Sequence, residues 1–321
     1  MEIFGNKNIT EKVSLMLQNN KLAHSFLLYG DKGLGKKTLA KYIAMRIFCK
    51  AENSPCGECF HCRNILNNTH PDVFIVEHSG KTNSISAETV RKVCNEVSIK
   101  PNYDSKVFIF EDADIMNNTA QNILLKSIEE PPEYAYYIFT SQTKDTFLPT
   151  ILSRVVSMGV TECSDKECIQ ALQSMNYTQA QIDDALNCFH GNIGNCLDYL
   201  NEGNLFKAVD IVKRFTTSLL NRDEYELLKV FTDLDIKNRE VTKVILSIMD
   251  KHIRDVIAVK IGCNTPAGCY FEGAKMLSTR LSIKSCTNIH MLVYQAFMEI
   301  DSNANMSLII ASLCGNVMQS I

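Results

Sequence analysis

The chain has 321 residues, of which 45% are hydrophobic and 21% are charged, and its formal net charge is −3. This length and balance predict a globular protein of two or three domains with a sizeable core. The net charge gives no general attraction to nucleic acid, and the lack of a run of about 18 apolar residues excludes a membrane-spanning helix.

The N-terminal segment and the cysteine content indicate the compartment. Met1–Ser14 lacks the basic, apolar and small-residue parts of a signal peptide, so we expect a cytoplasmic protein. The 13 cysteines would then lie in a reducing compartment, where metal ligands and buried thiols are commoner than disulfides.

The first half of the chain contains short apolar runs with the composition of β-strands. They are His24–Tyr29, Val73–Glu77, Val107–Phe110 and Ala135–Thr140. Helical patterns separate these runs, which is typical of βαβ units. The first half therefore predicts a mainly parallel sheet flanked by helices.

A glycine-rich loop follows the first strand. Gly30, Gly33, Gly35 and Lys36 fit the pattern G-x-x-x-x-G-K. Glycines let the backbone turn tightly and direct its N–H groups at phosphate oxygens, and the next helix adds the positive end of its dipole. Lys36 would reach the outer phosphates. The loop therefore predicts a binding site for ATP or ADP.

The residue after Lys36 departs from this pattern. It is Lys37, where the motif has a Ser or Thr hydroxyl that binds Mg²⁺. Thr38 follows, but one further helical residue rotates a side chain by about 100°, so we do not expect it to substitute. An ammonium group at this place opposes Mg²⁺ binding. The loop, including Lys37 and Thr38, therefore predicts nucleotide binding with weak or no hydrolysis.

A cysteine cluster follows the helix that begins at the loop. Its members are Cys49, Cys56, Cys59 and Cys62. Four thiolates at this spacing can close a tetrahedral shell around Zn²⁺, and a closed shell is structural rather than catalytic. The spacing predicts a structural zinc module over residues 49–62. A disulfide is the alternative, and His61 and His70 are rival zinc ligands.

The third strand ends in two carboxylates, Glu111 and Asp112. This layout is typical of sites that hold Mg²⁺ and polarise a water molecule, with Glu111 on the metal side and Asp112 on the water side. Nucleotide hydrolases of this type usually have the reverse order, Asp then Glu. Because Asp112 is shorter by a methylene, we expect its carboxylate to fall short of an attacking water. Two solvated carboxylates are the alternative.

Strand patterns disappear from Thr161 onward, and apolar residues then recur at helical spacing. Gly203 interrupts this pattern. We therefore predict three domains: an α/β nucleotide-binding domain at residues 1–160, a small helical domain at 161–203 and an all-helical domain at 204–321.

Several motifs occur in chain order and together resemble one family. Besides the loop and the cysteine cluster they are Leu22–Gly30, Thr69–Asp72, Asn122–Pro132 and Leu152–Arg154. This combination resembles the AAA+ clamp-loader ATPase domain that the gamma/tau and delta-prime subunits of bacterial DNA polymerase III share. The resemblance is strong over residues 1–200. It implies an α/β AAA+ domain with an inserted zinc module, a helical lid and an all-α collar.

Of the two subunit types, the sequence is more similar to delta-prime. A gamma/tau motor has Thr after the loop lysine, an Asp-Glu pair, and an Arg in its lid that contacts the nucleotide. The corresponding residues are Lys37, Glu111 with Asp112, and Gly194. The resemblance therefore implies an accessory subunit of the polymerase holoenzyme with weak or no ATP hydrolysis of its own.

The resemblance also implies one intact catalytic element. Ser153 and Arg154 match the family's S-R-C motif, with Val155 in place of the cysteine. In the family this arginine is a finger offered in trans to the γ-phosphate on a neighbouring subunit, a role that suits its planar charged fork. An ordinary surface arginine is the alternative. Ser141 lies where the family has a phosphate-sensing Thr or Asn.

The resemblance implies a hetero-oligomer with delta and gamma/tau subunits, acting with the sliding clamp and primer–template DNA in replication. Lys126 could face a DNA backbone, and a solvated lysine is the alternative. Two other functions stay open. An active gamma/tau-like ATPase would hydrolyse ATP by itself, and a zinc-dependent nucleic-acid-binding protein with a vestigial loop would bind DNA without partners.

Overall fold

The computed structural model describes residues 3–76, 84–232, 238–263, 268–302 and 304–321. Its contacts divide the chain into two compact units. The first unit comprises Met1–Ala171 together with Gly191–Gly194, and the second comprises Leu172–His190 together with Asn195–Ile321.

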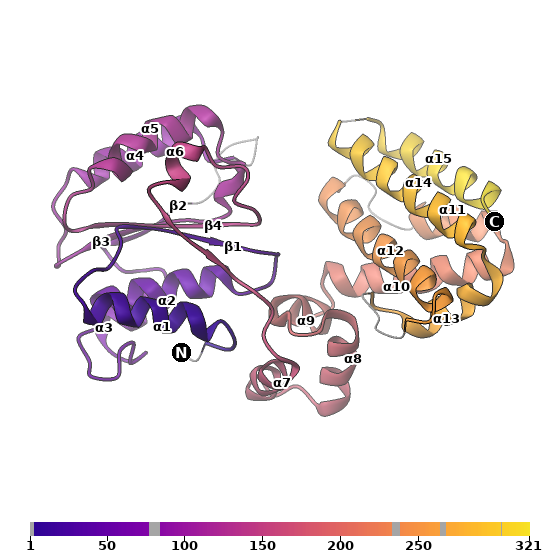
Figure 1. Ribbon diagram of the computed structural model, residues 1–321, viewed down its shortest axis with the longest axis horizontal. Helices are drawn as coiled ribbons and strands as arrows, with labels where there is room; N and C mark the ends of the chain where they lie inside the picture. Colours follow the sequence, from indigo (N-terminus) through magenta and orange to yellow (C-terminus); the bar gives the residue numbers. More distant parts are fainter. Residues whose placement is uncertain (1–2, 77–83, 233–237, 264–267, 303) are drawn as a thin grey trace. The chain divides into compact units, whose positions relative to one another are not determined.

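The first unit contains a five-stranded sheet in which neighbouring strands are parallel (Figure 1). The strand order is β2-β3-β4-β1-β5, and the bounds are β1 Ser25–Tyr29, β2 Val73–Val76, β3 Lys106–Phe110, β4 Ala135–Ser141 and β5 Val156–Gly159. The predicted parallel sheet is confirmed. The sequence did not predict β5, and Glu77, the predicted end of the second strand, lies outside the described residues.

Helices cover both faces of this sheet. Their bounds are α1 Lys7–Gln18, α2 Lys36–Phe48, α3 Phe60–Leu66, α4 Ala87–Val97, α5 Asn118–Glu129 and α6 Pro149–Leu152, and a short 3-10 turn, η1, spans Ala113–Ile115. Figure 1 shows α4, α5 and α6 on one face and α1, α2 and α3 on the other. A parallel sheet covered on both faces requires strands that are hydrophobic on both sides.

Successive residues of each strand contribute to two different cores because side chains alternate along a strand. In β1, Leu27 joins the core under α4 and α5, whereas Phe26 and Leu28 join the core under α1 and α2. The strands β3 and β4 alternate in the same way, with Phe108, Phe110, Tyr137 and Phe139 in the first core and Val107, Ile109 and Ile138 in the second. Because burial of one such side chain contributes about 1.5–3 kcal/mol, the two cores hold the strand ends in place.

The carboxyl ends of β1, β3 and β4 meet at one edge of the sheet. The main-chain N–H of Gly30, after β1, donates to the main-chain oxygen of Ser141 at 3.2 Å. The N–H of Asp112, after β3, donates to Thr140 Oγ1 at 3.0 Å. Parallel strands bring their carboxyl ends to the same edge. The glycine-rich loop and the acidic pair are therefore neighbours.

From Asp165 onward, the described residues form helices joined by turns and loops, with no strand among them. The bounds are α7 Asp165–Ser174, α8 Gln179–Phe189, α9 Ile193–Leu200, α10 Asn204–Asn221, α11 Glu224–Thr232, α12 Arg239–Lys260, α13 Phe271–Arg280, α14 Ile283–Asp301 and α15 Met306–Gln319. The predicted change from α/β to helical structure is confirmed. The exact boundaries at 160 and 203 stay predictions.

Long helices form the core of the second unit. Apolar side chains at helical spacing on α10, α12 and α14 meet there, including Phe215, Leu219, Ile245, Met249, Ile289 and Val293. Helix α12 begins after Asn238, whose side chain accepts from the N–H of Val241 at 3.3 Å and so satisfies a donor that the helix leaves unpaired. Among the described residues, no helix combines the length and the apolar run that crossing a bilayer requires.

Candidate functional site at the phosphate loop, with a cysteine cluster

The glycine-rich loop connects β1 to α2, and two of its glycines are required by the backbone. A Cβ atom on Gly30 would lie 2.3 Å from the main-chain oxygen of Val160. Gly35 precedes the first residue of α2 with φ of 81°, a conformation that glycine adopts at no steric cost. The local backbone therefore requires glycine at two of the positions whose spacing predicted a phosphate loop.

The loop lysine, Lys36, is folded back onto its own loop. Its Nζ donates to the main-chain oxygens of Gly30 at 2.6 Å and Asp31 at 2.7 Å. Burial lowers the pKa of Lys36, although the nearby carboxylate of Asp112 opposes this shift. A phosphate ligand would have to compete with the two carbonyl oxygens for the ammonium group.

The residue after it, Lys37, contacts both carboxylates at the end of β3. Its Nζ lies 2.7 Å from Glu111 Oε2 and 3.1 Å from Asp112 Oδ2. Burial lowers the pKa of Lys37, but its hydrogen bonds to Glu111 and Asp112 outweigh that effect and raise it. Thr38 is exposed on the first turn of α2. Two ion pairs therefore join three of the predicted nucleotide-site residues, namely Lys37, Glu111 and Asp112.

At the end of β4, Ser141 is fully buried, and its hydroxyl donates to the main-chain oxygen of Thr143. Its neighbour Thr140 accepts the Asp112 N–H and so ties β4 to the acidic turn. Sequence reasoning missed Thr140. Its position at the end of a predicted strand, next to the proposed phosphate sensor, was the available signal.

Residues 191–194 lie against the phosphate loop within the first unit. The N–H of Gly194 donates to the main-chain oxygen of Gly33 at 3.0 Å, and Asn192 Nδ2 donates to that of Lys32 at 2.9 Å. A Cβ on Gly194 would lie 2.5 Å from the Gly33 oxygen and 2.6 Å from its Cα. Position 194, where the resemblance places the lid arginine of motor subunits, therefore has no room for a side chain. Sequence reasoning missed the contact of Asn192 with the loop.

Arg154 follows the short helix α6 and is 38% exposed. Its Nη1 donates to the main-chain oxygen of Thr150 at 2.9 Å and to Ser153 Oγ at 3.0 Å. Its Nη2 pairs with Glu129 Oε1 at 2.9 Å. Glu129 lies in the motif Asn122–Pro132, but its pairing with Arg154 was not predicted, because Glu129 ends α5 and Arg154 follows α6.

The four cysteine sulfur atoms lie within 4.8 Å of one another. Cys49 follows α2, Cys59 caps α3, and Cys62 lies on its first turn. Zinc–sulfur bonds of about 2.3 Å place tetrahedral sulfurs about 3.8 Å apart, and the Sγ atoms of Cys49 and Cys56 are 3.7 Å apart. The donor set and the spacing fit a structural zinc ion.

The surroundings lower the pKa of Cys49 and Cys56, which favours at these two sulfurs the thiolate form that binds zinc, whereas burial raises the pKa of Cys62. Burial raises the pKa of Cys49, but hydrogen bonds from the main-chain N–H groups of Cys56 and Ala51 bring it down to about 6. All 13 cysteines lie in the described part of the chain, and none of them is bonded to another in a disulfide. A disulfide, the alternative that the sequence left open, does not occur among them.

The two histidines that the sequence left as rival ligands contact each other instead of joining the sulfur cluster. His61 Nδ1 lies 2.9 Å from His70 Nε2, and His70 Nδ1 accepts from the Asp72 N–H at 3.1 Å. The ring of His70 also packs on Phe48 with centroids 4.4 Å apart. The candidate ligand group therefore consists of cysteines alone.

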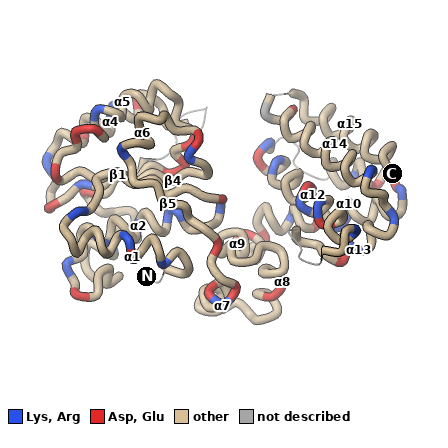
Figure 2. Tube along the Cα trace, viewed as in Figure 1, with Lys and Arg blue, Asp and Glu red and all other residues tan. Residues whose placement is uncertain are grey.

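Basic and acidic positions are mixed along the described parts of both units (Figure 2), in keeping with the net charge of −3. Lys126 is exposed on α5, and its contact with DNA stays a prediction.

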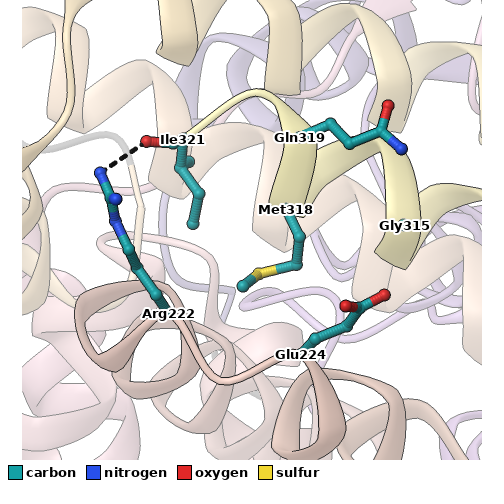
Figure 3. Close-up of a pocket in the computed structure, with 6 residues that line it drawn as sticks. All are labelled: Arg222, Glu224, Gly315, Met318, Gln319 and Ile321. Carbon is teal, nitrogen blue, oxygen red and sulfur yellow. Dashed lines mark hydrogen bonds between the residues drawn. The ribbon is translucent and has the colours of Figure 1, made fainter.

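Two of the hollows among the described residues of the second unit include residues of α15. One, of 340 Å³, is lined by Arg222, Glu224, Gly315, Met318, Gln319 and Ile321 (Figure 3). Arg222 donates there to the main-chain oxygen of Ile321 at 2.8 Å. The other, of 760 Å³, runs along α14 and α15 and includes Met291, Tyr294 and Met298.

Comparison with known proteins agrees with the resemblance in the motifs. A protein-family model described as "DNA polymerase III, delta subunit" matches residues 5–164. The delta-prime subunit of DNA polymerase III from Pseudomonas aeruginosa is 38% identical over 140 residues, which are 43% of each chain. The DNA polymerase III subunit gamma of Buchnera aphidicola is 26% identical over 247 residues, 74% of this chain and 67% of that protein.

A solved structure from Thermotoga maritima, a DNA polymerase III gamma subunit-related protein, is 14% identical, with a TM-score of 0.47, over 97% of this chain and 98% of that one. The chain spans less than half the length of the Pseudomonas relative. The five-stranded parallel sheet, its glycine-rich loop and the helical domains that follow define an AAA+ fold of the clamp-loader type. The chain belongs to the delta-prime family of DNA polymerase III clamp-loader subunits, which is related to gamma/tau.

Proposed function

We propose that this chain acts as the delta-prime subunit of a clamp loader, supplies Arg154 in trans to a neighbouring nucleotide site, and hydrolyses little or no ATP by itself. In the assembled loader it would help place the sliding clamp on primed DNA during replication. The observation that carries this proposal is the contact of the Lys37 ammonium with both Glu111 and Asp112, at 2.7 and 3.1 Å.

This contact removes the groups on which hydrolysis depends. A metal-assisted hydrolase uses its carboxylates to hold the metal and to orient the attacking water. Here each carboxylate already has a cationic partner on the same chain. Asp112 also has the shorter side chain at the water-side position. Both features support a site that binds nucleotide without turning it over.

Arg154 has the properties that a donated arginine needs. It lies at the surface, it is always charged, and its planar fork suits phosphate oxygens. Its partners Ser153 and Glu129 fix the guanidinium at the end of α6. An arginine finger can raise the rate by about 10³–10⁵ in GTPases, so one such residue suffices to make this chain necessary for a neighbour's turnover.

The proposed partners are the delta and gamma/tau subunits, with the sliding clamp and primer–template DNA reached through the complex. Exposed apolar side chains of α14 support an assembly through the helical unit: Met291 is 58% exposed, Tyr294 56% and Met298 51%. Aromatic and methionine side chains of this kind are enriched in protein interfaces.

The proposed cofactors are a structural zinc ion and a bound nucleotide. Cys49, Cys56, Cys59 and Cys62 would hold the zinc, which would cross-link the segment between α2 and α3. ATP or ADP would occupy the loop between β1 and α2.

The test is ATP turnover by the purified chain alone and after mixing with its cognate delta and gamma/tau subunits. We expect no turnover alone and a clamp- and DNA-stimulated rate in the mixture, which Arg154→Ala lowers by more than about tenfold at the receiving site. Arg91→Ala, at an exposed position on α4, is the matched control. Steady turnover by the chain alone would instead identify a gamma/tau-like motor, and an unchanged rate with Arg154→Ala would refute the finger.

A further inference from the structure

The phosphate loop does not fit the metal ion that nucleotide hydrolases of this fold use. Mg²⁺ requires an octahedral set of oxygen ligands, usually with carboxylate and hydroxyl groups from the protein. The hydroxyl position is occupied by Lys37, whose ammonium contacts both carboxylates. Mg²⁺ bound at Glu111 or Asp112 would meet a positive charge within hydrogen-bond distance of its ligands.

The ammonium group of Lys37 has the charge and the donors to take the place of Mg²⁺ beside the two carboxylates. It is a compact cation with three donors, and two of them are directed at Glu111 and Asp112. The side chain of Lys37 is 50% exposed, while that of Glu111 is 15% exposed. The third donor can therefore serve a ligand that enters from the loop. The acidic pair is neutralised in part, which lowers its repulsion of an incoming polyphosphate.

The shape of the loop is also held by groups other than a metal. The N–H of Gly194 and the amide of Asn192 bind the main-chain oxygens of Gly33 and Lys32. Lys36 binds two further loop oxygens from the inside. These contacts fix the loop through its carbonyl oxygens, which are the groups that do not contact a bound phosphate.

We propose that this loop binds a nucleoside di- or triphosphate without a divalent metal ion, with the ammonium of Lys37 in place of Mg²⁺ between the phosphates and the acidic pair. The inference rests on the proposed nucleotide site and is independent of the Arg154 finger.

The experiment is calorimetric titration of the full chain with ADP in Mg²⁺ and in EDTA. We expect the wild-type chain to bind ADP in EDTA at least as tightly as in Mg²⁺. Lys37→Thr supplies the hydroxyl and releases the carboxylates, so its binding should become at least about tenfold tighter in Mg²⁺ than in EDTA. Lys37 is half exposed, so the variant should fold, which its thermal unfolding would check.

The matched control is Lys41→Thr, on the same helix, where the side chain contacts the main-chain oxygen of Leu66 rather than a carboxylate. It should bind like wild type in both conditions. Wild-type binding that is about tenfold tighter in Mg²⁺, or no ADP binding in either condition, would overturn the inference. Neither result bears on the loss of loader ATPase with Arg154→Ala, so the two proposals fail separately.

Discussion

The phosphate-loop region and the α6 region both hold a cation that is paired within the chain, but the pairs differ in burial. Lys36 is 6% exposed and donates to two oxygens of its own loop. Arg154 is 38% exposed and pairs with Glu129, which is 44% exposed. Exposed pairs of this kind contribute about 0–1 kcal/mol. Arg154 can therefore exchange Glu129 for a phosphate easily, whereas Lys36 would lose buried hydrogen bonds.

Under the proposed function, this difference would allow one chain to lose its own hydrolytic site and keep a residue that acts on a neighbour's nucleotide. A loop lysine and an acidic pair serve the nucleotide bound to their own chain. An arginine finger serves the nucleotide of a neighbour, so changes at the loop leave its chemistry intact. The comparison can be tested by substituting residues in one region and measuring whether stability, hydrogen exchange or ATP turnover changes in the other.

The largest effect should come from the cysteine cluster, which begins at the C-terminal end of α2. Cys56→Ser combined with Cys59→Ser should remove a bound zinc ion, one per chain, because two of four ligands are lost. The melting temperature should fall by several degrees, since each kcal/mol is worth about 2–4 °C in a chain of this size. Zinc content by atomic absorption and thermal unfolding are the measurements.

Cys263→Ser, in the helical unit, is the control and should keep both the zinc and the melting temperature. Hydrogen exchange should rise between α2 and α3 but not around Arg154, which would preserve the distinction between the two regions. A metal-free wild-type protein of unchanged stability would exclude the zinc module.

The next effect concerns Gly194. Arg at this position, as in the related motor subunits, would place its Cβ 2.5 Å from the main-chain oxygen of Gly33. Gly194→Arg should therefore separate residues 191–194 from the loop and destabilise the chain by about 1–3 kcal/mol, measured by urea unfolding. Gly315→Ala is the control because no atom lies within 4 Å of its added Cβ. Equal stability of both variants would contradict the close contact.

The smallest effect should come from Glu129. Glu129→Gln should change stability by less than about 1 kcal/mol and loader ATPase by less than about threefold, because the ion pair with Arg154 is exposed. The measurements are urea unfolding and ATP turnover of the assembled loader, with Glu130→Gln as the neighbouring control. A loss as large as that of Arg154→Ala would make Glu129 an essential part of the finger.

Features with strict local spacing were predictable from the sequence. The glycines of the loop, the C-x2-C-x2-C spacing and the apolar strands each depend on residues near one another in the chain. The helical second half was predictable for the same reason, since α10 and α12 have apolar residues at helical spacing.

Features that depend on distant partners were not predictable. The strand β5, Val156–Gly159, contains serine and glycine and becomes a strand through its pairing with β1. Glu129 meets Arg154, and Gly194 meets Gly33, only after the sheet has brought separate segments together. No periodicity marks these pairs. The reversed order of Glu111 and Asp112 was visible in the sequence. Their ion pairs with Lys37 could not be predicted, because they depend on where the ends of β1 and β3 lie in the folded sheet.

The contact between Gly194 and Gly33 also bears on how such a chain can change in evolution. A lysine at position 37 can become threonine by one substitution at a half-exposed site. An arginine at position 194 must displace the backbone of residues 191–194 from the loop before its guanidinium can reach a phosphate. Each intermediate would carry the strain without the catalytic gain. The close contact therefore opposes an arginine at position 194 and, under the proposed function, favours a chain that acts through Arg154 on a neighbouring site.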